Sequence, residues 1–169
     1  MAVTIEPLGK RHDRAAFSCG QPALDDWFRN RAGQDEKRDV ARVFVAVDDT
    51  LGIVGFYSLS SLHLTIDDLP EAIARKLPRY DAIPAALIGR LARDNRARGS
   101  GLGGLLLADA VRRILGAGRS VAVFAIVVDA KDEAAVAFYQ SFGFIPLSTR
   151  PRRLFLLASV AARAFADSQ

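Results

Sequence analysis

The run Arg98-Gly99-Ser100-Gly101-Leu102-Gly103-Gly104 constrains the fold of this 169-residue chain more than any other stretch. It separates an apolar segment, 85–93, that predicts a strand from an amphipathic helix expected between Leu102 and about Leu115. Glycine has no Cβ, so backbone N–H groups in such a loop approach a ligand closely. The first turn of the helix adds unpaired N–H groups and the positive end of its dipole. The sequence therefore predicts a phosphate-binding loop.

Two common phosphate-binding loops fit this run poorly. A Walker loop carries Lys and then Ser or Thr after its last glycine, but two leucines follow here. The dinucleotide fingerprint Gly-x-Gly-x-x-Gly is formally present, and Asp129 ends the next predicted strand at about the right distance. In dinucleotide folds, however, the strand runs almost directly into the first glycine. The polar segment 94–98 intervenes here, and no further strand–helix–strand units follow.

A third phosphate-binding pattern, Arg-x-x-Gly-x-Gly, is matched by Arg98-x-x-Gly101-x-Gly103 and, two residues earlier, by Arg96-x-x-Gly99-x-Gly101. Downstream stands Asp132-x-x-Ala135-x-x-x-Tyr139-x-x-Phe142-Gly143-Phe144. In this order the two motifs resemble the Gcn5-related N-acetyltransferases, the GNAT family, which hold acetyl-coenzyme A. The resemblance implies an α/β (α+β) fold in which a mixed, mostly antiparallel sheet with two splayed central strands is flanked by helices.

The same resemblance implies the residues of the site. Tyr139 would lie beside the thioester sulfur as the catalytic acid, because a phenol donates a proton at neutral pH. Asp132 stands where relatives often carry Asn, and it serves equally well as a helix cap. The expected cofactor contacts are Leu91, Ala92, Arg93, Arg98, Gly99, Ser100, Gly101, Leu102, Gly103, Gly104, Asp132 and Phe138.

A narrower resemblance covers nearly the whole chain. It is carried, in order, by Phe17-x-Cys19-Gly20 with Leu24-Asp25, Gly55-Phe56-Tyr57-Ser58-Leu59, Ile83-Pro84, Gly89-Arg90-Leu91-Ala92 and Val128-Asp129-Ala130-Lys131. Together these segments are similar to the acetyltransferase toxins of bacterial type II toxin–antitoxin systems. Members of that subfamily acetylate the α-amine of aminoacyl-tRNA and block translation. The resemblance implies a ribbon-helix-helix antitoxin as partner, contact with operator DNA only through that antitoxin, and a homodimer.

The strand before the glycine run carries no general base. Many GNAT relatives place Glu there, whereas residues 87–93 include no carboxylate and the first one is Asp94. A lysine amine, with a pKa of about 10.4, usually needs a base at pH 7, whereas a free α-amine titrates near about 7.7–8.0. The amine of an aminoacyl ester titrates lower still, because the ester withdraws electrons. A site without a strong base therefore suits charged tRNA, although water relays or a carboxylate such as Asp129 stay open as alternatives.

The formal net charge is +4, and the basic residues are unevenly distributed. Candidate nucleic-acid contacts are Arg75, Lys76, Arg79 and Arg90, and Arg150, Arg152 and Arg153 form a second basic cluster. Such clusters indicate a polyanionic substrate such as RNA, although a solvated face beside the cofactor loop would carry the same charge. Strand alternation predicts that Arg90 and Arg93 point to opposite faces.

Composition favours a single globular domain over residues 1–169, since half of the residues are hydrophobic. No apolar run has the length of a membrane span and the N-terminus lacks a signal-peptide pattern, so we expect a cytoplasmic protein without membrane contact. The lone Cys19 and two histidines predict no metal site, and Cys19 is expected to be a small buried residue. Two other functions stay open: acetylation of a small amine or a protein N-terminus, and non-catalytic binding of acetyl-coenzyme A or a partner.

Periodicity and turn residues predict the remaining elements. An edge strand is expected over 3–8, and a helix from Pro22 to about Lys37. Strands at 43–47 and 53–59 form a hairpin, whose second strand could continue to 66. A short helix is expected over 69–77, a buried strand over 121–128 and a helix from Asp132 to Phe142 that ends at Gly143. Two closing strands are expected over 144–148 and 154–158, and the last ten residues are expected to fray.

Overall fold

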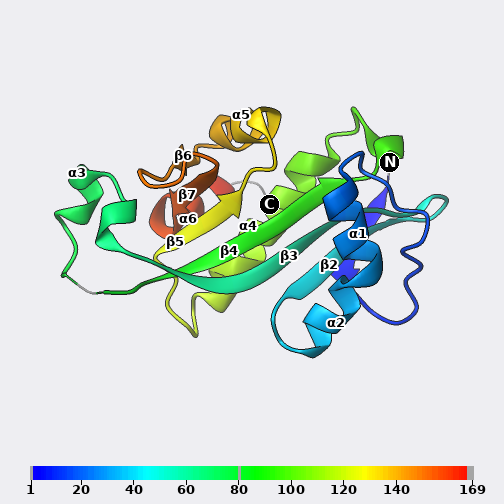
Figure 1. The fold of residues 1–169 in the computed structure, drawn as a ribbon, viewed down its shortest axis with the longest axis horizontal. Helices are drawn as coiled ribbons and strands as arrows, with labels where there is room; N and C mark the ends of the chain where they lie inside the picture. The colour runs from blue at the N-terminus through cyan, green and yellow to red at the C-terminus, as the bar shows by residue number, and fades with distance from the viewer. Residues whose placement is uncertain (1, 80, 167–169) are drawn as a thin grey trace. The chain divides into compact units, whose positions relative to one another are not determined.

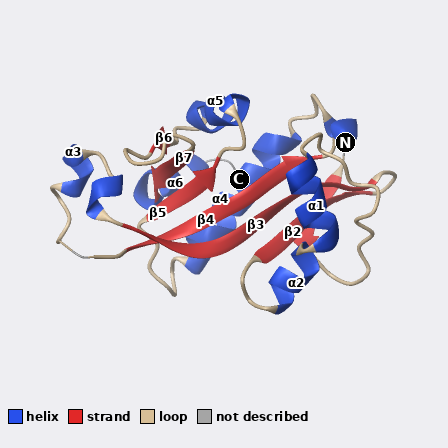
Figure 2. Ribbon diagram, in the orientation of Figure 1, coloured by secondary structure: helices blue, strands red, loops and turns tan. Residues whose placement is uncertain are grey.

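The computed structural model describes residues 2–79 and 81–166, which form a mixed fold of helices and strands (Figure 1, Figure 2). The strands are β1 (Val3–Pro7), β2 (Arg42–Asp48), β3 (Gly52–Leu64), β4 (Ile83–Arg93), β5 (Ala125–Asp129), β6 (Ile145–Pro146) and β7 (Arg153–Leu157). The α-helices are α1 (Pro22–Asn30), α2 (Ala32–Lys37), α3 (Glu71–Ala74), α4 (Leu102–Ala117), α5 (Glu133–Ser141) and α6 (Ala158–Ala166). Two short 3-10 helices are η1 (Ile66–Asp68) and η2 (Asn95–Ala97).

The strands follow the order β1-β2-β3-β4-β5-β7-β6 in one sheet, with β1 at an edge as predicted. β1, β2 and β3 pair antiparallel in sequence, and β7 pairs antiparallel with both β5 and β6. β4 and β5 are parallel, and their ladder ends at Ile88 and Val128 while β4 continues to Arg93. The mixed, mostly antiparallel sheet that the resemblance implied is therefore confirmed.

The chain divides into two compact units. The first unit runs through Ser60 and adds Gly89–Ala110; the second comprises Ser61–Ile88 and the residues from Val111 onward. Three elements, β3, β4 and α4, run from one unit into the other. Each unit has a hydrophobic cluster of its own.

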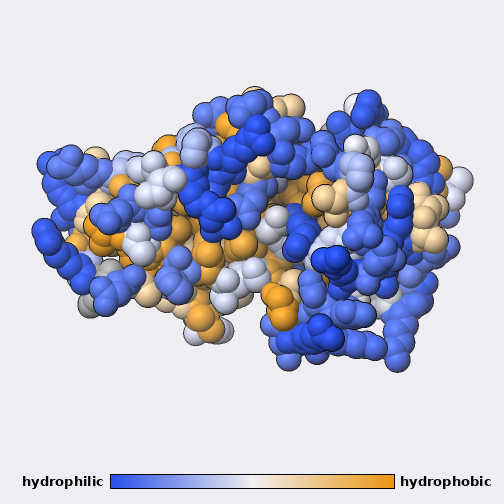
Figure 3. Space-filling view, in the orientation of Figure 1, coloured by the Kyte–Doolittle hydropathy of each residue, from blue (hydrophilic) through white to orange (hydrophobic). Residues whose placement is uncertain are grey.

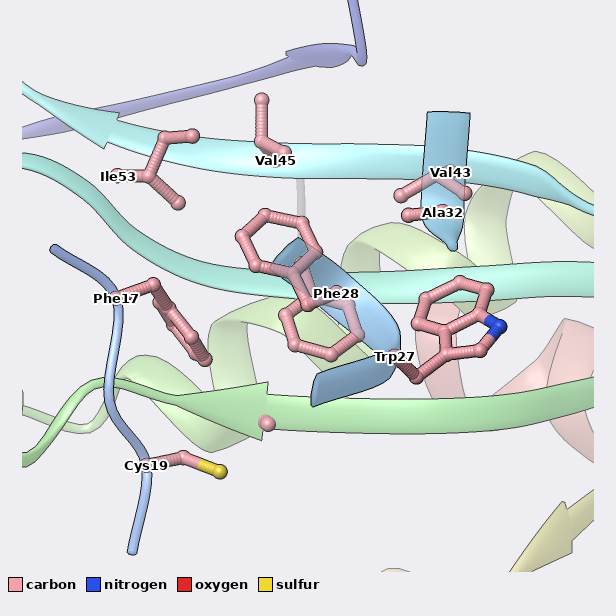
Figure 4. Packing of buried hydrophobic residues seen from close by; sticks show 10 residues of the cluster. Phe17, Cys19, Trp27, Phe28, Ala32, Val43, Val45 and Ile53 are labelled. Atoms are coloured by element: carbon pink, nitrogen blue, oxygen red, sulfur yellow. The ribbon is translucent and has the colours of Figure 1, made fainter. Parts of the chain in front are cut away.

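Aromatic rings form the core of the first unit (Figure 4). Trp27 and Phe28 of the amphipathic helix α1 are buried, while the outer faces of α1 and α2 are mainly hydrophilic (Figure 3). Phe28 stacks on Phe56 of β3 with ring centroids 4.2 Å apart, and Phe17 meets both rings edge-on. Such aromatic pairs stabilise a core beyond the area they bury. Cys19 belongs to this cluster and is buried, as predicted.

The other face of β3 supports the first half of α4. Gly55 makes this close packing possible, because a Cβ there would lie 2.9 Å from Cδ1 of Leu106 and 3.2 Å from Cδ2 of Leu102. The carbonyl oxygen of Ala92 would be only 3.3 Å away. Glycine at this position therefore sets how closely α4, and the glycine run at its start, approaches the sheet.

Aliphatic side chains dominate the core of the second unit. β5 is fully buried from Ala125 to Val128, as expected of a strand covered on both faces. Its neighbours in the cluster come from β3, β4, β7 and two connecting segments: Leu64, Leu69, Ile83, Ala85, Leu147 and Phe155.

Two predicted helices differ from the observed ones. The helix expected over 22–37 is interrupted at Arg31, where φ is −123° and ψ is −25°, and the buried Ala32 starts α2. The helix expected over 69–77 is confined to α3. The N–H groups of Lys76 and Leu77 bond three residues back, to Ile73 and Ala74, so the chain continues in tighter turns.

The strand predicted over 121–128 begins only at Ala125. The N–H groups of Ser120 and Val121 bond to the carbonyl of Ala117, so the chain is still turning after α4, and Val121 is 72% exposed. The closing strands are shorter than predicted, with β6 limited to Ile145–Pro146 and β7 ending at Leu157.

The prediction that the last ten residues fray is wrong for most of them. Residues 158–166 form α6, which buries Ala161 and Phe165, and residues 167–169 lie outside the described part of the chain. The N–H of Ala158 bonds to the carbonyl of Phe124 at 2.9 Å, which anchors the start of this helix.

Candidate functional site

The glycine run forms a turn at the N-terminus of α4. Gly99 and Gly101 have φ of +75° and +79°, a conformation that residues with a Cβ rarely adopt. A Cβ on either glycine would meet nothing within 4 Å, so this side of the loop is open. Among the described residues, no oxygen accepts a hydrogen bond from the N–H groups of residues 99 and 101–104. The loop therefore presents a set of unpaired donors at a helix N-terminus, which suits a phosphate group.

The arginines that precede the loop differ in their contacts. The carboxylate of Asp94, 2% exposed, accepts hydrogen bonds from Nε of Arg96 at 2.8 Å and from Nη2 at 3.0 Å. It also accepts from the N–H groups of Ser18 and Arg96. Burial alone would raise the pKa of Asp94, but the hydrogen bonds from Arg96 and Ser18 lower it. The side chain of Arg98, in contrast, is exposed and has no ion pair within the described residues. Of the two matches to the Arg-x-x-Gly-x-Gly pattern, the one that begins at Arg98 therefore has the guanidinium that is available to a ligand.

The end of β4 presents backbone groups away from β3. The N–H of Arg90 bonds to Oγ of Ser58 and that of Asp94 bonds to the carbonyl of Val54, so even-numbered residues face β3. Backbone groups of a strand alternate in direction, so those of Leu91 and Arg93 point the other way. The ladder with β5 has ended by Ile88. These two N–H groups are therefore placed to bond a ligand that lies along the strand.

Tyr139 lies in α5 with its ring buried between Phe138 and Phe144, which it meets edge-on. Its hydroxyl has no hydrogen-bond partner among the described residues. Among the described residues, the side-chain nitrogens and oxygens that are both buried and without a hydrogen-bond partner comprise only Nη1 of Arg93. The Tyr139 oxygen also has no partner but is not one of these buried atoms, so solvent reaches it. Burial of the ring, and secondarily the charge of Asp129, raise the pKa of Tyr139. The phenol is therefore protonated at physiological pH and available as a proton donor.

Asp129 is engaged elsewhere. Its two carboxylate oxygens accept from Nε of Arg153 at 2.7 Å and from Nη2 at 3.0 Å, a two-point ion pair. Both oxygens of this carboxylate are therefore already hydrogen-bonded to Arg153.

Asp132 caps α5, since its side chain accepts a 2.8 Å hydrogen bond from the N–H of Ala135, as predicted. The helix ends before Gly143, where φ is +94°, also as predicted. Phe138 precedes Tyr139 in the same helix and is half-buried. Cap, helix and terminal glycine together set the position of Tyr139 along the chain.

The four candidate nucleic-acid contacts occur in different surroundings. Arg75, Lys76 and Arg79 follow α3 and are exposed, and Arg75 and Arg79 line a hollow of about 690 Å³ with Asp67, Glu71 and Asp81. Arg90 belongs to the first unit, where its guanidinium lies 4.0 Å from the ring centroid of Trp27. This contact places Arg90 on the α1 face of the sheet. Lys76 does not line the hollow of Arg75 and Arg79.

Several contacts of the site were not visible in the sequence. Ser18 is 76 positions from Asp94, and no spacing rule links them. The pairing of Arg153 with Asp129 likewise depends on the register of β5 and β7, in which these two residues are direct partners. A sequence signal for either pair would have required the strand pairing to be known.

The residues present fit coenzyme A. The open loop with positive-φ glycines and unpaired N–H groups suits its pyrophosphate, and the N–H groups of Leu91 and Arg93 suit the amide and carbonyl oxygens of an extended arm. In the second unit, the unpaired phenol of Tyr139 is a proton donor of the kind that a leaving thiolate requires. Fold and site together define an acyltransferase that uses a coenzyme A thioester.

Comparison with known proteins agrees with this class of enzyme. Residues 39–146 match the model of the acetyltransferase (GNAT) domain. The chain is 40% identical to a protein named probable toxin TacT from Sinorhizobium fredii (strain NBRC 101917 / NGR234), over 90% of this chain and 89% of that one. It is 39% identical to the tRNA-acetylating toxin of Mycobacterium tuberculosis (strain ATCC 25618 / H37Rv), over 92% of both chains. The chain therefore belongs to the GNAT family of acetyl-coenzyme A-dependent N-acetyltransferases.

Solved structures share the fold. The structure of AtaT complexed with acetyl-methionyl-tRNAfMet has a TM-score of 0.89 at 29% identity and covers 97% of this chain and 99% of that one. AtaTR bound with AcCoA has a TM-score of 0.84 at 29% identity, with coverage of 96% and 98%. The AtaT-AtaR complex bound to DNA has a TM-score of 0.76 at 27% identity, with coverage of 96% and 99%.

No group of three or more His, Cys, Asp and Glu side chains in residues 2–79 and 81–166 is arranged to hold a metal ion. In the same part of the chain, no helix combines the length and the apolar character needed to cross a membrane.

Proposed function

We propose that this protein is the toxin of a type II toxin–antitoxin pair that acetylates the α-amine of aminoacyl-tRNA and so blocks translation. The observation that carries the proposal is the similarity to the tRNA-acetylating toxin, 39% identity over 92% of both chains. The shared fold of AtaT, solved with acetyl-methionyl-tRNAfMet, supports the same substrate.

Bound acetyl-coenzyme A would supply the activated acetyl thioester. The N–H groups of the loop from Arg98 to Gly104 would hold its phosphates, and those of Leu91 and Arg93 would orient its arm. Ala92, Asp132 and Phe138 are further proposed contacts. Tyr139 would hold a proton at Oη and deliver it to the leaving sulfur, as the amine nitrogen bonds to the acetyl carbon and the C–S bond breaks. Solvent takes the proton released by the amine and restores the one lost by Tyr139.

Arginines pair with Asp94 in the first unit and with Asp129 in the second. This pairing supports an α-amine as acceptor. An amine that is already largely neutral at physiological pH needs no strong base, whereas a lysine side chain does.

The proposed contacts for tRNA are Arg75, Lys76 and Arg79 in the second unit and Arg90 in the first. The proposed protein partner is a ribbon-helix-helix antitoxin, through which operator DNA is contacted, and the AtaT-AtaR complex with DNA supports this arrangement. A cytoplasmic location follows from the substrate. We also propose a homodimer, which light scattering would test. We propose a single domain, because three elements run through both compact units.

The decisive experiment incubates the purified protein with labelled acetyl-coenzyme A and a pool of charged tRNA. The proposal requires label on the aminoacyl group, none on uncharged tRNA, and loss of label with Tyr139→Phe. Cofactor binding with no label on RNA would redirect the search to small amines or protein N-termini. Cofactor binding with no transfer to any amine would favour a non-catalytic module. In cells, expression should arrest growth and Tyr139→Phe should relieve the arrest.

A further inference from the structure

The loop between β6 and β7 is held at both ends, within the second unit. At its start, Oγ1 of Thr149 donates a 2.6 Å hydrogen bond to Oδ1 of Asp68, and the N–H of Ser148 bonds to the Asp68 carbonyl. At its end, Arg153 makes its two-point ion pair with Asp129. Asp68 is itself fixed, because its Oδ2 accepts from the N–H and hydroxyl of Thr65. The loop is therefore preformed.

Backbone hydrogen bonds hold the middle of the loop. The N–H of Ala130 bonds to the carbonyl of Arg152 at 2.8 Å, and that of Arg153 bonds to the carbonyl of Arg150 at 3.0 Å. Burial would raise the pKa of Asp68, but the hydrogen bonds from Thr149 and Thr65 lower it. Asp68 is therefore a charged acceptor at neutral pH, and the anchor at Thr149 persists.

The loop offers two guanidinium groups to a ligand. Arg153 is committed to Asp129, whereas Arg152 meets Glu133 at 3.3 Å with both side chains more than half exposed, a pair worth little in water. Arg150 is exposed and has no ion pair among the described residues. A hollow of about 580 Å³ is lined by Asp129, Ala130, Thr149, Arg150, Pro151, Arg152 and Arg153.

This hollow adjoins α5, the helix that carries the proposed proton donor. Arg152, which lines the hollow, meets Glu133 in the first turn of that helix, and the charge of Asp129, which also lines it, raises the pKa of Tyr139. Asp68, which accepts the hydrogen bond from Thr149, directly follows Asp67, which lines the hollow of Arg75 and Arg79. The loop thus connects the surroundings of Tyr139 with Arg75 and Arg79, two arginines already proposed as RNA contacts.

We propose that residues 149–153 are a phosphate-binding loop that holds the sugar–phosphate backbone of the charged tRNA near Tyr139. This inference rests on the proposed function. Arginine matches a phosphate with paired N–H donors, and a loop that is already ordered loses little conformational entropy on binding. Because Arg153 and Thr149 are fixed by internal partners, Arg150 and Arg152 are the residues that contact phosphate.

The test compares the double variant Arg150→Ala/Arg152→Ala with wild type in tRNA binding between 50 and 200 mM salt, which are chosen conditions spanning roughly the range over which phosphate contacts weaken. Two lost phosphate contacts should reduce the salt slope by about 1.4–1.8 and the affinity at low salt about tenfold. The matched control, Arg119→Ala/Arg163→Ala, removes the same charge from exposed positions of the same unit and should change the slope by much less.

A second variant tests the anchoring. Thr149→Val removes the hydrogen bond to Asp68 but keeps every arginine, so affinity should fall a few-fold with the salt slope unchanged. In both variants, acetyl-coenzyme A binding should stay within about twofold of wild type and the KM for charged tRNA should rise more than kcat falls.

The outcomes separate this loop from the function as a whole. If wild type acetylates charged tRNA but the double variant keeps its affinity and slope, the phosphate-binding loop is refuted and the function stands. A loss of acetyl-coenzyme A binding in place of tRNA binding would assign the loop to the cofactor phosphates and also overturn the proposal. If wild type acetylates no charged tRNA, the proposed function itself fails.

Discussion

The phenol of Tyr57 donates a 2.6 Å hydrogen bond to Oδ2 of Asp109, and this bond ties β3 to α4. Tyr57 is fully buried, and α4 is the helix whose first turn forms the glycine loop. The bond therefore helps to hold that loop on the sheet, together with the close contact at Gly55.

Tyr57→Phe should lower the free energy of unfolding by about 1.5–3 kcal/mol, since a hydrogen bond to a charged group is lost. Urea unfolding measures this. Tyr139→Phe is the matched control, because the Tyr139 hydroxyl has no partner among the described residues and its removal should leave stability nearly unchanged. Equal losses in the two variants would contradict the assignment of the Tyr57 bond.

Tyr139→Phe should reduce kcat for acetyl transfer by a factor of tens or more while acetyl-coenzyme A binding stays within about twofold. Because burial raises the pKa of Tyr139, the wild-type rate should show no loss from phenol ionisation up to about pH 9.5, near the ordinary tyrosine pKa of about 10. Rates measured across that range check both points. An alkaline decline with an apparent pKa below 9 (an approximate threshold) that the Phe variant lacks would show an acidic phenol instead.

Gly101→Ala should weaken acetyl-coenzyme A binding about fivefold to thirtyfold. Alanine costs about 1–2 kcal/mol in the left-handed conformation, so the free loop would leave the binding geometry. Gly116→Ala is the control, because Gly116 lies within α4, has open space around it and should gain about 0.5–1 kcal/mol of stability with unchanged binding. Isothermal titration measures the affinities, and unchanged binding by the Gly101 variant would remove the loop from the cofactor site.

Asp94→Asn should destabilise the protein at neutral pH, because Arg96 and two N–H groups lose a buried carboxylate. Asp49→Asn, a charge change at an exposed turn, should have little effect.

The ion pair between Asp94 and Arg96 should also make the free energy of unfolding depend on pH in the acid range. The pKa of Asp94 is lowered in the folded state, so its contribution is complete above the ordinary value of about 3.9 and declines as pH falls through the folded value. The difference in urea midpoint between wild type and Asp94→Asn should thus be constant from about pH 7 to 5 and narrow below about pH 4. A difference that persists unchanged at pH 3 (chosen to lie roughly one unit below the ordinary Asp value) would contradict this role.

Local signals in the sequence predicted the parts of the site that depend on neighbouring residues. Gly99 and Gly101 adopt positive φ, Asp132 caps α5 and Gly143 ends it. These features need only a missing Cβ or a side-chain oxygen three residues from an N–H, so the order of residues contains them. The acetyltransferase fold and the role of Tyr139 were implied by the family resemblance.

Tertiary structure alone decided which charges are paired. Nothing in the order of residues distinguishes Arg153, held by Asp129, from Arg150, which is exposed, because the difference comes from the register of β7 against β5. Thr149 and Asp68 are 81 positions apart, and their contact exists only once the chain has folded. The start of β5 was misplaced for a similar reason, since the N–H of the apolar Val121 still bonds to the carbonyl of Ala117 in the turn after α4. Hydrophobic pattern and local chemistry determine elements, whereas hydrogen bonds between distant residues depend on how those elements pack.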